Sequence, residues 1–254
     1  MQPLSVVIIT LNEAERIDRC IRSVQGLSDD ILVVDSGSTD DTVALAEKAG
    51  ARVVHQNWLG FGAQKKFATS QSRHDWVLAL DADEWLSDAL KQSIADVLQN
   101  PEADAYEMPR RNLFLGRWLR HGEGYPDYSL RLYNRNKANW REDRVHEAVH
   151  CSGKVGRLKG DLMHQSADTL QQYLHKHNRY TSLQAEQLFA NGERFSLFKL
   201  LFSPWVRFVK FYFLRLGFLD GTAGLIHIAA GCWTVFAKHS KLLELQQRDT
   251  AKKG

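Results

Sequence analysis

The sequence predicts an α/β fold in which a mostly parallel sheet is flanked by helices and followed by a helical, partly amphipathic C-terminal region. Two observations predict the sheet: short apolar segments alternate with helical segments through the first hundred residues, and polar residues follow the apolar segments directly. A third observation concerns the last third of the chain, which is rich in Phe, Leu and Trp at helical spacing but carries scattered charges. We therefore expect one domain over residues 1–165 and a helical region over residues 166–254.

Four strands are predicted in the first part of the chain. Each is a short apolar run, as strands buried on both faces of a parallel sheet are. They are Leu4–Thr10, Ile31–Val34, Ala51–His55 and Trp76–Leu80. Because parallel neighbours need a crossover connection, we expect right-handed strand–helix–strand units.

Helices are predicted after the first, second and fourth strands. Their expected N-terminal caps are Asn12, Ser38 or Thr39, and Ser87. Gly26 and Gly50 are expected to end the first two helices. The helix after Ser87 carries an apolar face made of Leu90, Ile94, Val97 and Leu98.

Composition excludes several classes of protein. The 254 residues are 44% hydrophobic and 25% charged, which indicates a folded chain with a sizeable core. A net charge of +3 is too small to indicate nucleic-acid binding. Three distant cysteines indicate neither a disulfide framework nor a zinc site, which favours a reducing, cytoplasmic setting. Since no basic stretch precedes the first apolar run, we expect neither a signal peptide nor a membrane anchor.

Polar residues follow three of the predicted strands. In parallel sheets ligands bind outside the carboxyl ends of the strands, so these residues are candidates for one binding crevice. They are Thr10, Asn12 and Glu13 after the first strand, Asp35 after the second, and Asp81, Asp83 and Glu84 after the fourth. Asp35 ends an apolar strand, where its carboxylate is placed to accept a hydrogen bond from a pyrimidine ring N–H or a sugar hydroxyl.

Asp81 and Asp83 form an Asp-x-Asp motif directly after an apolar strand. Charge at such a place is costly unless something positive compensates it. Two carboxylates at this spacing can share Mg²⁺ or Mn²⁺ with a diphosphate, although many such pairs are only turns or helix caps, as we interpret Asp88. The sequence has no glycine-rich phosphate loop of the NAD or P-loop type, so a metal would have to offset the diphosphate charge.

Taken in order, these motifs resemble those of family 2 inverting glycosyltransferases of the GT-A type. Further segments are similar to bacterial lipopolysaccharide inner-core β-glucosyltransferases: Gly60–Lys65, Arg111–Gly116, Tyr125–Asp127, Arg131–Tyr133, Val145–Glu147 and Gly217–Gly221. The resemblance implies a GT-A nucleotide-sugar-binding fold, a UDP-sugar donor, a divalent metal and an acceptor sugar on the lipid A core oligosaccharide. One departure is Ala82, where other members carry a hydroxyl residue; both carboxylates are present.

An inverting transfer needs a general base that takes the proton of the acceptor hydroxyl. Asp143 and Glu147 are the candidates, with Asp127 as a third option. Alternatively, Glu147 pairs with Arg144 or Arg131 and only shapes the acceptor loop.

Gln64 and Lys65 follow a glycine-rich turn. We predict that they contact the phosphates or the sugar of the donor. The alternative is that Lys65 and Lys66 lie on a solvated helix face.

The C-terminal region is predicted to meet a membrane surface without crossing it. Ser203-Pro204 is expected to open a helix with one apolar stripe, formed by Trp205, Phe208, Val209, Tyr212 and Leu216. Such a stripe is typical of an interfacial helix, and equally of core packing. Nearby charges such as Lys199 and Arg207 disfavour a spanning helix.

The sequence thus predicts a metal-dependent enzyme that transfers a hexose, with glucose as the first choice, from a UDP-sugar to an inner-core heptose. It is expected to be cytoplasmic and peripheral on the inner membrane. Two alternatives are a membrane-bound scaffold that binds a nucleotide sugar without turnover, and a phosphatase with Asp81 as nucleophile.

Overall fold

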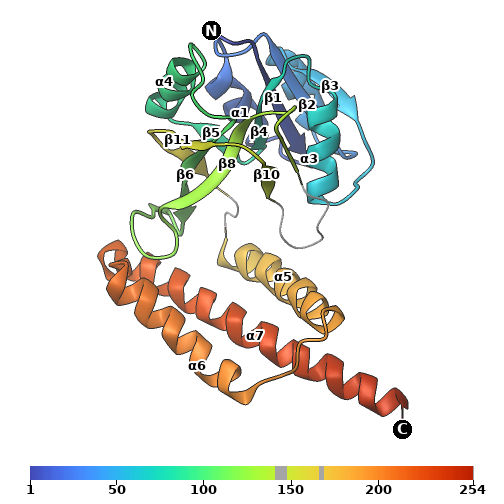
Figure 1. The fold of residues 1–254 in the computed structure, drawn as a ribbon, viewed down its shortest axis with the longest axis vertical. Coiled ribbons are helices and arrows are strands. Elements are labelled where there is room, and N and C mark those ends of the chain that lie inside the picture. Colours follow the sequence, from blue (N-terminus) through green and yellow to red (C-terminus); the bar gives the residue numbers. More distant parts are fainter. Residues whose placement is uncertain (141–147, 166–168, 254) are drawn as a thin grey trace. The chain divides into compact units, whose positions relative to one another are not determined.

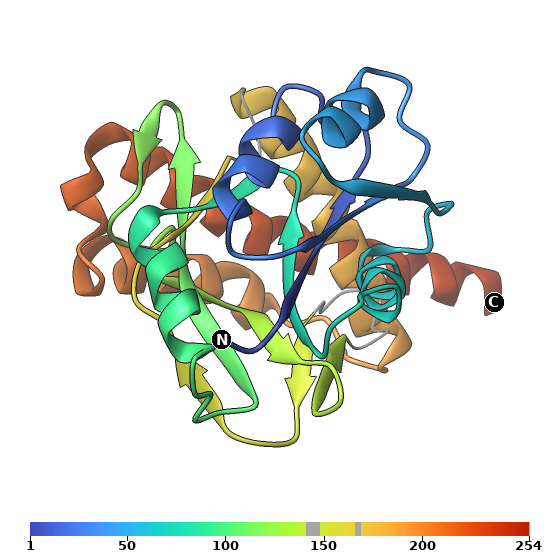
Figure 2. The ribbon, with the colours of Figure 1, turned by 90° about the horizontal axis from the view of Figure 1, so that it is seen from above.

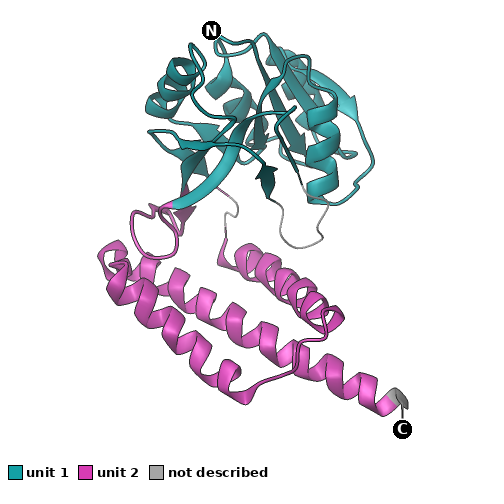
Figure 3. Ribbon diagram, viewed as in Figure 1, with its two compact units in different colours: residues 1–110, 127–164 teal, residues 111–126, 165–254 magenta. Residues whose placement is uncertain are grey.

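The chain folds into two compact units, which are shown as a ribbon in Figure 1 and in separate colours in Figure 3. The computed structural model describes residues 1–140, 148–165 and 169–253. Unit 1 comprises Met1–Arg110 and Asp127–His164, and unit 2 comprises Arg111–Pro126 and Gln165–Gly254. Residues 111–126, which lie inside the predicted first domain, therefore belong to unit 2.

Unit 1 is built on one sheet with the strand order β3-β2-β1-β4-β8-β6-β12-β5. The strands on this path are β1 (Leu4–Thr10), β2 (Asp30–Asp35), β3 (Arg52–His55), β4 (Trp76–Asp81), β5 (Glu84–Leu86), β6 (Ala105–Phe114), β8 (Asp127–Asn134) and β12 (Leu162–His164). Strands β1 to β4 pair in parallel, whereas β8 is antiparallel to both β4 and β6. The predicted parallel sheet is confirmed, and antiparallel strands extend it.

Further short strands complete the β structure of the described residues. They are β7 (Arg117–Trp118), β9 (Ala138–Trp140), β10 (Val149–Cys151) and β11 (Val155–Arg157). Strands β7 and β11 pair with β6, while β9 and β10 form a separate antiparallel pair.

Helices cover both faces of the sheet. Helices α1 (Ile17–Val24), α2 (Thr42–Lys48) and α4 (Asp88–Val97) contribute to one apolar cluster, and α3 (Phe61–Ser70) contributes to another. Strand β1 supplies alternate residues to the two clusters, with Val6 and Ile8 in the first and Val7 and Ile9 in the second, as its period of two requires. Figure 2 shows α4 (green) and α3 (cyan) to either side of β1 (dark blue).

Two of the predicted helix caps are wrong and one is confirmed. Helix α1 begins after Arg16, because the Asn12 side chain instead accepts a hydrogen bond from the Thr39 backbone N–H at 2.8 Å. Helix α2 begins after Asp41, and not at Ser38 or Thr39. The predicted cap of α4 is present, since Ser87 accepts a hydrogen bond from the N–H of Leu90.

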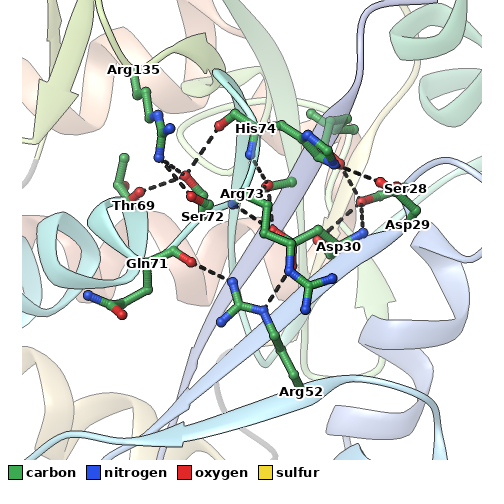
Figure 4. A network of polar contacts seen from close by, with 12 residues as sticks. Ser28, Asp29, Asp30, Arg52, Thr69, Gln71, Ser72, Arg73, His74 and Arg135 are labelled. Atoms are coloured by element: carbon green, nitrogen blue, oxygen red, sulfur yellow. Dashed lines mark hydrogen bonds and ion pairs between the residues drawn. The ribbon is translucent and has the colours of Figure 1, made fainter.

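A polar network anchors the N-terminal end of the sheet, opposite the loops that follow Thr10 and Asp35 (Figure 4). Its centre is Asp30, whose side chain is fully buried. The carboxylate accepts hydrogen bonds from the Ser5 hydroxyl at 2.6 Å, from Arg52 Nε at 2.9 Å and from the Arg73 backbone N–H at 2.9 Å. This network ties together β1, β2, β3 and the connection into β4.

The described part of unit 2 is built on long helices, of which α7 packs against both α5 and α6. The helical elements are α5 (Leu170–Ala190), α6 (Leu197–Phe208), a π-helical segment (Val209–Leu214), a 3₁₀ turn (Gly217–Asp220) and α7 (Gly221–Lys253). Helix α6 begins at Leu197 because Ser196 caps it, so the predicted start at Ser203-Pro204 is wrong and Pro204 lies inside the helix.

Among the described residues, no single helix is long and apolar enough to cross a membrane. The stretches Leu197–Leu214 and Gly217–Ala251 meet the length and composition requirement only as a pair, with a bend of 75° between them.

Candidate active site

The carboxyl ends of three adjacent strands bring the predicted site residues to one edge of the sheet. In the strand register Thr10 is the partner of Asp35, and Ile9 is the partner of Asp81. Thr10 and Asp35 are both buried, and the Thr10 hydroxyl has no hydrogen-bond partner within the described part of the chain. The strand ends therefore meet as the sequence predicts.

The loops after β1 and β2 hold one another in place. Asp35 accepts hydrogen bonds from the N–H groups of Gly37 at 2.8 Å and Ser38 at 3.0 Å, and also from the Ser38 hydroxyl. The Ser38 hydroxyl in turn accepts one from the N–H of Asn12 at 2.8 Å. Each carboxylate oxygen has two acceptor positions, so Asp35 can bind its own loop and still accept a hydrogen bond from a nucleoside.

Asn12 and Glu13 fix these loops. Glu13 donates its backbone N–H to the Thr42 hydroxyl at 2.8 Å, while its carboxylate pairs with Arg16 at 2.8 Å. Asn12 has a left-handed backbone, with φ of 55°, and its side-chain oxygen is bonded to the Thr39 N–H. The predicted contacts of both residues with a nucleotide sugar stay predictions.

Gln64 is fully buried on α3 and connects the loops after β2 and β3. Its amide NH₂ group donates to the Ser36 hydroxyl and to the Gln56 carbonyl, both at 3.1 Å. Its amide oxygen accepts a hydrogen bond from the N–H of Leu59 at 3.3 Å. Gln64 thus positions the loop after Asp35 through its hydrogen bond to Ser36. Its place in the sequence did not indicate this role.

Two protein cations compensate the charge of Asp81. Lys65 Nζ lies 2.9 Å from Asp81 Oδ1, and Arg131 Nη2 donates to Asp81 Oδ2 at 2.8 Å. Both cations are buried, and the Trp140 ring lies against them, 4.8 Å from Lys65 Nζ and 5.7 Å from the Arg131 guanidinium carbon. The positive charge expected after β4 is therefore supplied, for Asp81, by the chain itself.

Glu84 extends this charge network. Its side chain is fully buried and accepts hydrogen bonds from Arg131 at 2.7 Å and Arg110 at 3.4 Å, while its other oxygen accepts one from the Asp81 backbone N–H at 3.0 Å. Arg110 also donates twice to Asp127, at 2.9 and 2.6 Å. Three carboxylates and three cations thus form one connected set.

These contacts set the charge states of the network. Burial by itself raises the pKa of Asp81, but Lys65 and Arg131 outweigh burial and hold that pKa well below its usual range. Burial opposes the charge of Arg131, yet Glu84 and Asp81 raise its pKa above the usual value. The pKa of Arg110 is also raised, because Asp127 and Glu84 outweigh burial. Asp81 is therefore ionised at neutral pH, with its charge already balanced.

Asp83 lies beside His164, a residue that the sequence reasoning did not select. Strand β12 pairs with β5 so that His164 is opposite Glu84, which is the residue after Asp83. His164 Nε2 is 3.4 Å from Asp83 Oδ2, and both side chains are largely buried. The only local signal was a histidine at the end of the short run Leu162–His164.

The donor set of this pair suits a divalent cation. Cis ligands of a six-coordinate ion held at about 2.1 Å lie about 3 Å apart, which is close to the observed separation of the carboxylate oxygen and the imidazole nitrogen. Over the described residues there is no group of three or more His, Cys, Asp or Glu side chains with metal-binding geometry. An ion here would take its other ligands from phosphate and water, as Mg²⁺ usually does.

Of the three candidate general bases, the structure describes only Asp127. Asp143 and Glu147 lie outside the described residues. Asp127 lies on β8, where the Arg110 guanidinium already occupies its Oδ2. A carboxylate held in this way is poorly placed to take a hydroxyl proton.

Within unit 2, Asp220 holds the segment around Arg120. This buried carboxylate accepts hydrogen bonds from the N–H groups of Arg120 at 2.9 Å and His121 at 2.8 Å. The Arg117 guanidinium donates to the carbonyl of Leu219 at 3.1 Å. The motif Gly217–Gly221 therefore fixes the basic residues of the hairpin between β6 and β8.

Residues 5–159 match the family model described as Glycosyl transferase family 2. The chain belongs to glycosyl transferase family 2. An uncharacterized glycosyltransferase of Rickettsia typhi is 35% identical over 96% of this chain and 88% of its own length. The lipopolysaccharide core biosynthesis glycosyltransferase LpsC of Rhizobium meliloti is 32% identical over 95% of this chain and 92% of its own.

A solved structure also shares the fold. TarS 1-349 of S. aureus, in a complex with UDP-GlcNAc, aligns with a TM-score of 0.53 at 16% identity and covers 97% of this chain and 92% of that one. The predicted GT-A fold and the predicted glycosyltransferase activity are confirmed. Family membership also removes the basis of the phosphatase alternative, which rested on the Asp-x-Asp motif, with Asp81 as nucleophile and Asp83 as acid.

Proposed function

We propose that this glycosyltransferase moves a hexose from a UDP-sugar to a heptose of the lipopolysaccharide core, with glucose as the first candidate sugar. The acceptor rests on the similarity to LpsC, whose name places it in lipopolysaccharide core biosynthesis. The donor class is supported by the buried acceptor groups of Thr10 and Asp35 at the strand ends, which suit the ring N–H and hydroxyls of a nucleoside.

The observation that carries the proposal is the pair formed by Asp83 and His164. These two residues would hold Mg²⁺ or Mn²⁺, and the ion when bound would supply Lewis-acid assistance to the departing diphosphate. An imidazole ligand is better suited to Mn²⁺ than to Mg²⁺, because it is the softer donor.

The remaining residues have positioning roles in this proposal. Arg131 and Lys65 hold Asp81 at the end of β4, which fixes the start of the turn that carries Asp83. Because their charges are balanced within the protein, we assign Asp81 and Lys65 to the support of the site, with Asp83 as the carboxylate that meets the ion. Asp143 and Glu147 are the proposed bases for the acceptor hydroxyl.

A transfer assay tests this proposal. Purified protein is incubated with UDP-glucose, UDP-galactose or UDP-GlcNAc and a core oligosaccharide that ends in heptose, and the released UDP and the new product are quantified. We expect transfer from one UDP-hexose, loss of transfer with EDTA, and recovery with Mn²⁺. Undiminished transfer in EDTA would contradict the metal assignment, and transfer only to an acceptor without heptose would contradict the acceptor.

The scaffold alternative predicts a different result. A scaffold would bind UDP in calorimetry but would release no UDP from any donor with any core acceptor. Calorimetry and turnover measured on the same preparation separate the two.

A further inference from the structure

The outward side of α6 is apolar along its whole length. Its exposed large side chains are Leu197, Phe198, Leu201, Phe202, Trp205 and Val206. Phe198 and Trp205 are each 69% exposed. Val209, Phe213 and Leu214, in the π-helical segment that follows, are also exposed. We call these nine residues the apolar face. A helix that packs on a soluble core has the opposite arrangement, with its apolar side buried.

The charges that flank the apolar face are mostly positive, although Glu193 pairs with Lys199 at 3.4 Å. Residues 195–219 contain four cations and no Asp or Glu. Lys199 and Lys210 are exposed and lie eleven positions apart, which is about three helical turns, so they lie along one edge of the face. Arg207 lies on the other side of the helix, where it pairs with Glu123.

We propose that the apolar face docks on an anionic phospholipid bilayer, with α6 lying in the plane of the membrane surface. An interfacial helix combines exposed aromatic and aliphatic residues with flanking lysines, as this one does. Trp is favoured at the depth of the headgroups, and Trp205 belongs to the apolar face, on which Phe198 also stacks on Phe202. The protein would then be a peripheral protein of the membrane surface.

A second copy of the chain is a poorer occupant of this face. A two-fold interface places the same patch on both partners, so it would bring the lysines of one copy toward those of the other. Glu193 pairs with Lys199, but residues 195–219 offer no carboxylate for Lys210, whereas anionic headgroups do. The proposal rests on unit 2 alone and does not depend on which sugar is transferred.

Vesicle flotation of the full chain tests the proposal. The vesicles are pure phosphatidylcholine, or phosphatidylcholine with about one third phosphatidylglycerol, a fraction high enough to give a clearly negative surface potential. The variant is Leu201→Glu, and the matched control is Leu174→Glu, which places the same change at an exposed position of α5. We expect the wild type and Leu174→Glu to float with anionic vesicles, and Leu201→Glu to bind about tenfold or more weakly.

The electrostatic part has its own variant. Lys199→Gln with Lys210→Gln should weaken binding to anionic vesicles by roughly fivefold per lysine and leave binding to phosphatidylcholine unchanged. Trp205→Gln provides a second test of the apolar part if Leu201→Glu fails to fold by circular dichroism.

Three results would overturn the proposal. They are no flotation of the wild type, equal flotation of Leu201→Glu and Leu174→Glu, and a dimer without vesicles that Leu201→Glu dissociates. Transfer activity on a soluble core oligosaccharide is measured in parallel. Failure of membrane docking with intact transfer leaves the proposed function standing, and the reverse result leaves the docking surface standing.

Discussion

His164 Nε2 lies 3.4 Å from Asp83 Oδ2, although one residue ends β12 and the other follows β4. The pairing of β12 with β5 is what brings them together. The printed ion pairs of Asp81 are with Lys65 and Arg131, so a change at Asp83 or His164 leaves both of those cations in place.

Asp83→Asn and His164→Gln are each expected to weaken Mn²⁺ binding by more than about tenfold, and transfer should fall in parallel. Each variant removes one of the two proposed protein ligands while leaving the strands intact. Mn²⁺ affinity is measured by electron paramagnetic resonance with UDP present, so the result does not depend on activity.

His74→Gln is the control for this pair. His74 Nε2 also contacts a carboxylate, Asp29, at 2.8 Å, but at the opposite end of the sheet. It should leave Mn²⁺ affinity unchanged. If all three variants bind Mn²⁺ as the wild type does, the metal is held elsewhere.

Arg131→Met is expected to lower the free energy of unfolding by about 3–5 kcal/mol, because it leaves Asp81 and Glu84 buried with too few cations. Urea unfolding at neutral pH measures the change. Arg157→Met is the control, since Arg157 pairs with Glu107 at the surface and its loss should leave the unfolding midpoint almost unchanged. Equal losses in the two variants would mean that the network around Asp81 is not specifically stabilising.

The strand ends that form the candidate site could largely be predicted from the sequence. Buried parallel strands appear as short apolar runs, and a polar residue directly after such a run marks the end of the strand. Thr10, Asp35, Asp81 and Asp83 all lie at or directly after such strand ends. Their partners could not be predicted in the same way. Arg131 reaches Asp81 only because β8 inserts antiparallel beside β4, a pairing that leaves no local pattern.

The wrong helix caps have a related cause. Asn is a residue type that often caps helices, but the side-chain oxygen of Asn12 accepts a hydrogen bond from Thr39, in the loop after β2. When a side chain has several backbone groups within reach, the tertiary structure and not local propensity determines which of them it bonds. The same holds for Gln64, whose buried amide connects two loops that are separate in the sequence.

The environment of Asp30 makes the folding stability of the protein sensitive to acid. Burial by itself raises the pKa of Asp30, but hydrogen bonds from Arg52, Ser5 and the Arg73 N–H lower it below the ordinary value. Because the folded-state pKa lies below the unfolded value of about 3.9, this stabilisation is complete well above pH 3.9. It decreases as the pH falls below the unfolded value and is lost as the pH falls through the lower folded-state pKa.

Asp30→Asn should therefore cost about 1–3 kcal/mol of unfolding free energy at pH 7, and the difference from wild type should shrink toward pH 3. Urea unfolding at several pH values measures it. The control is Asp29→Asn, because Asp29 is the exposed neighbour in the same turn. A difference from wild type that is the same at pH 7 and pH 3 would show that the charge of Asp30 is not what stabilises the network.

Gly160 precedes β12 and has a left-handed backbone, with φ of 88°. A Cβ at this position would lie 2.3 Å from the backbone nitrogen of Leu90, in the first turn of α4. Gly160→Ala therefore combines backbone strain with a clash that neither backbone can relieve without moving. Gly192→Ala isolates the first effect, since Gly192 has φ of 74° and a Cβ added there would meet no atom of the described residues within 4 Å.

We expect Gly192→Ala to cost about 1–2 kcal/mol of unfolding free energy, and Gly160→Ala to cost clearly more. Because β12 carries His164, a shift of Gly160 away from α4 should also weaken Mn²⁺ binding, whereas Gly192→Ala should not. Urea unfolding and Mn²⁺ titration of both variants measure the two effects. Equal stability losses would mean that α4 and the turn at Gly160 separate at little cost, and the position of His164 would then not depend on their close approach.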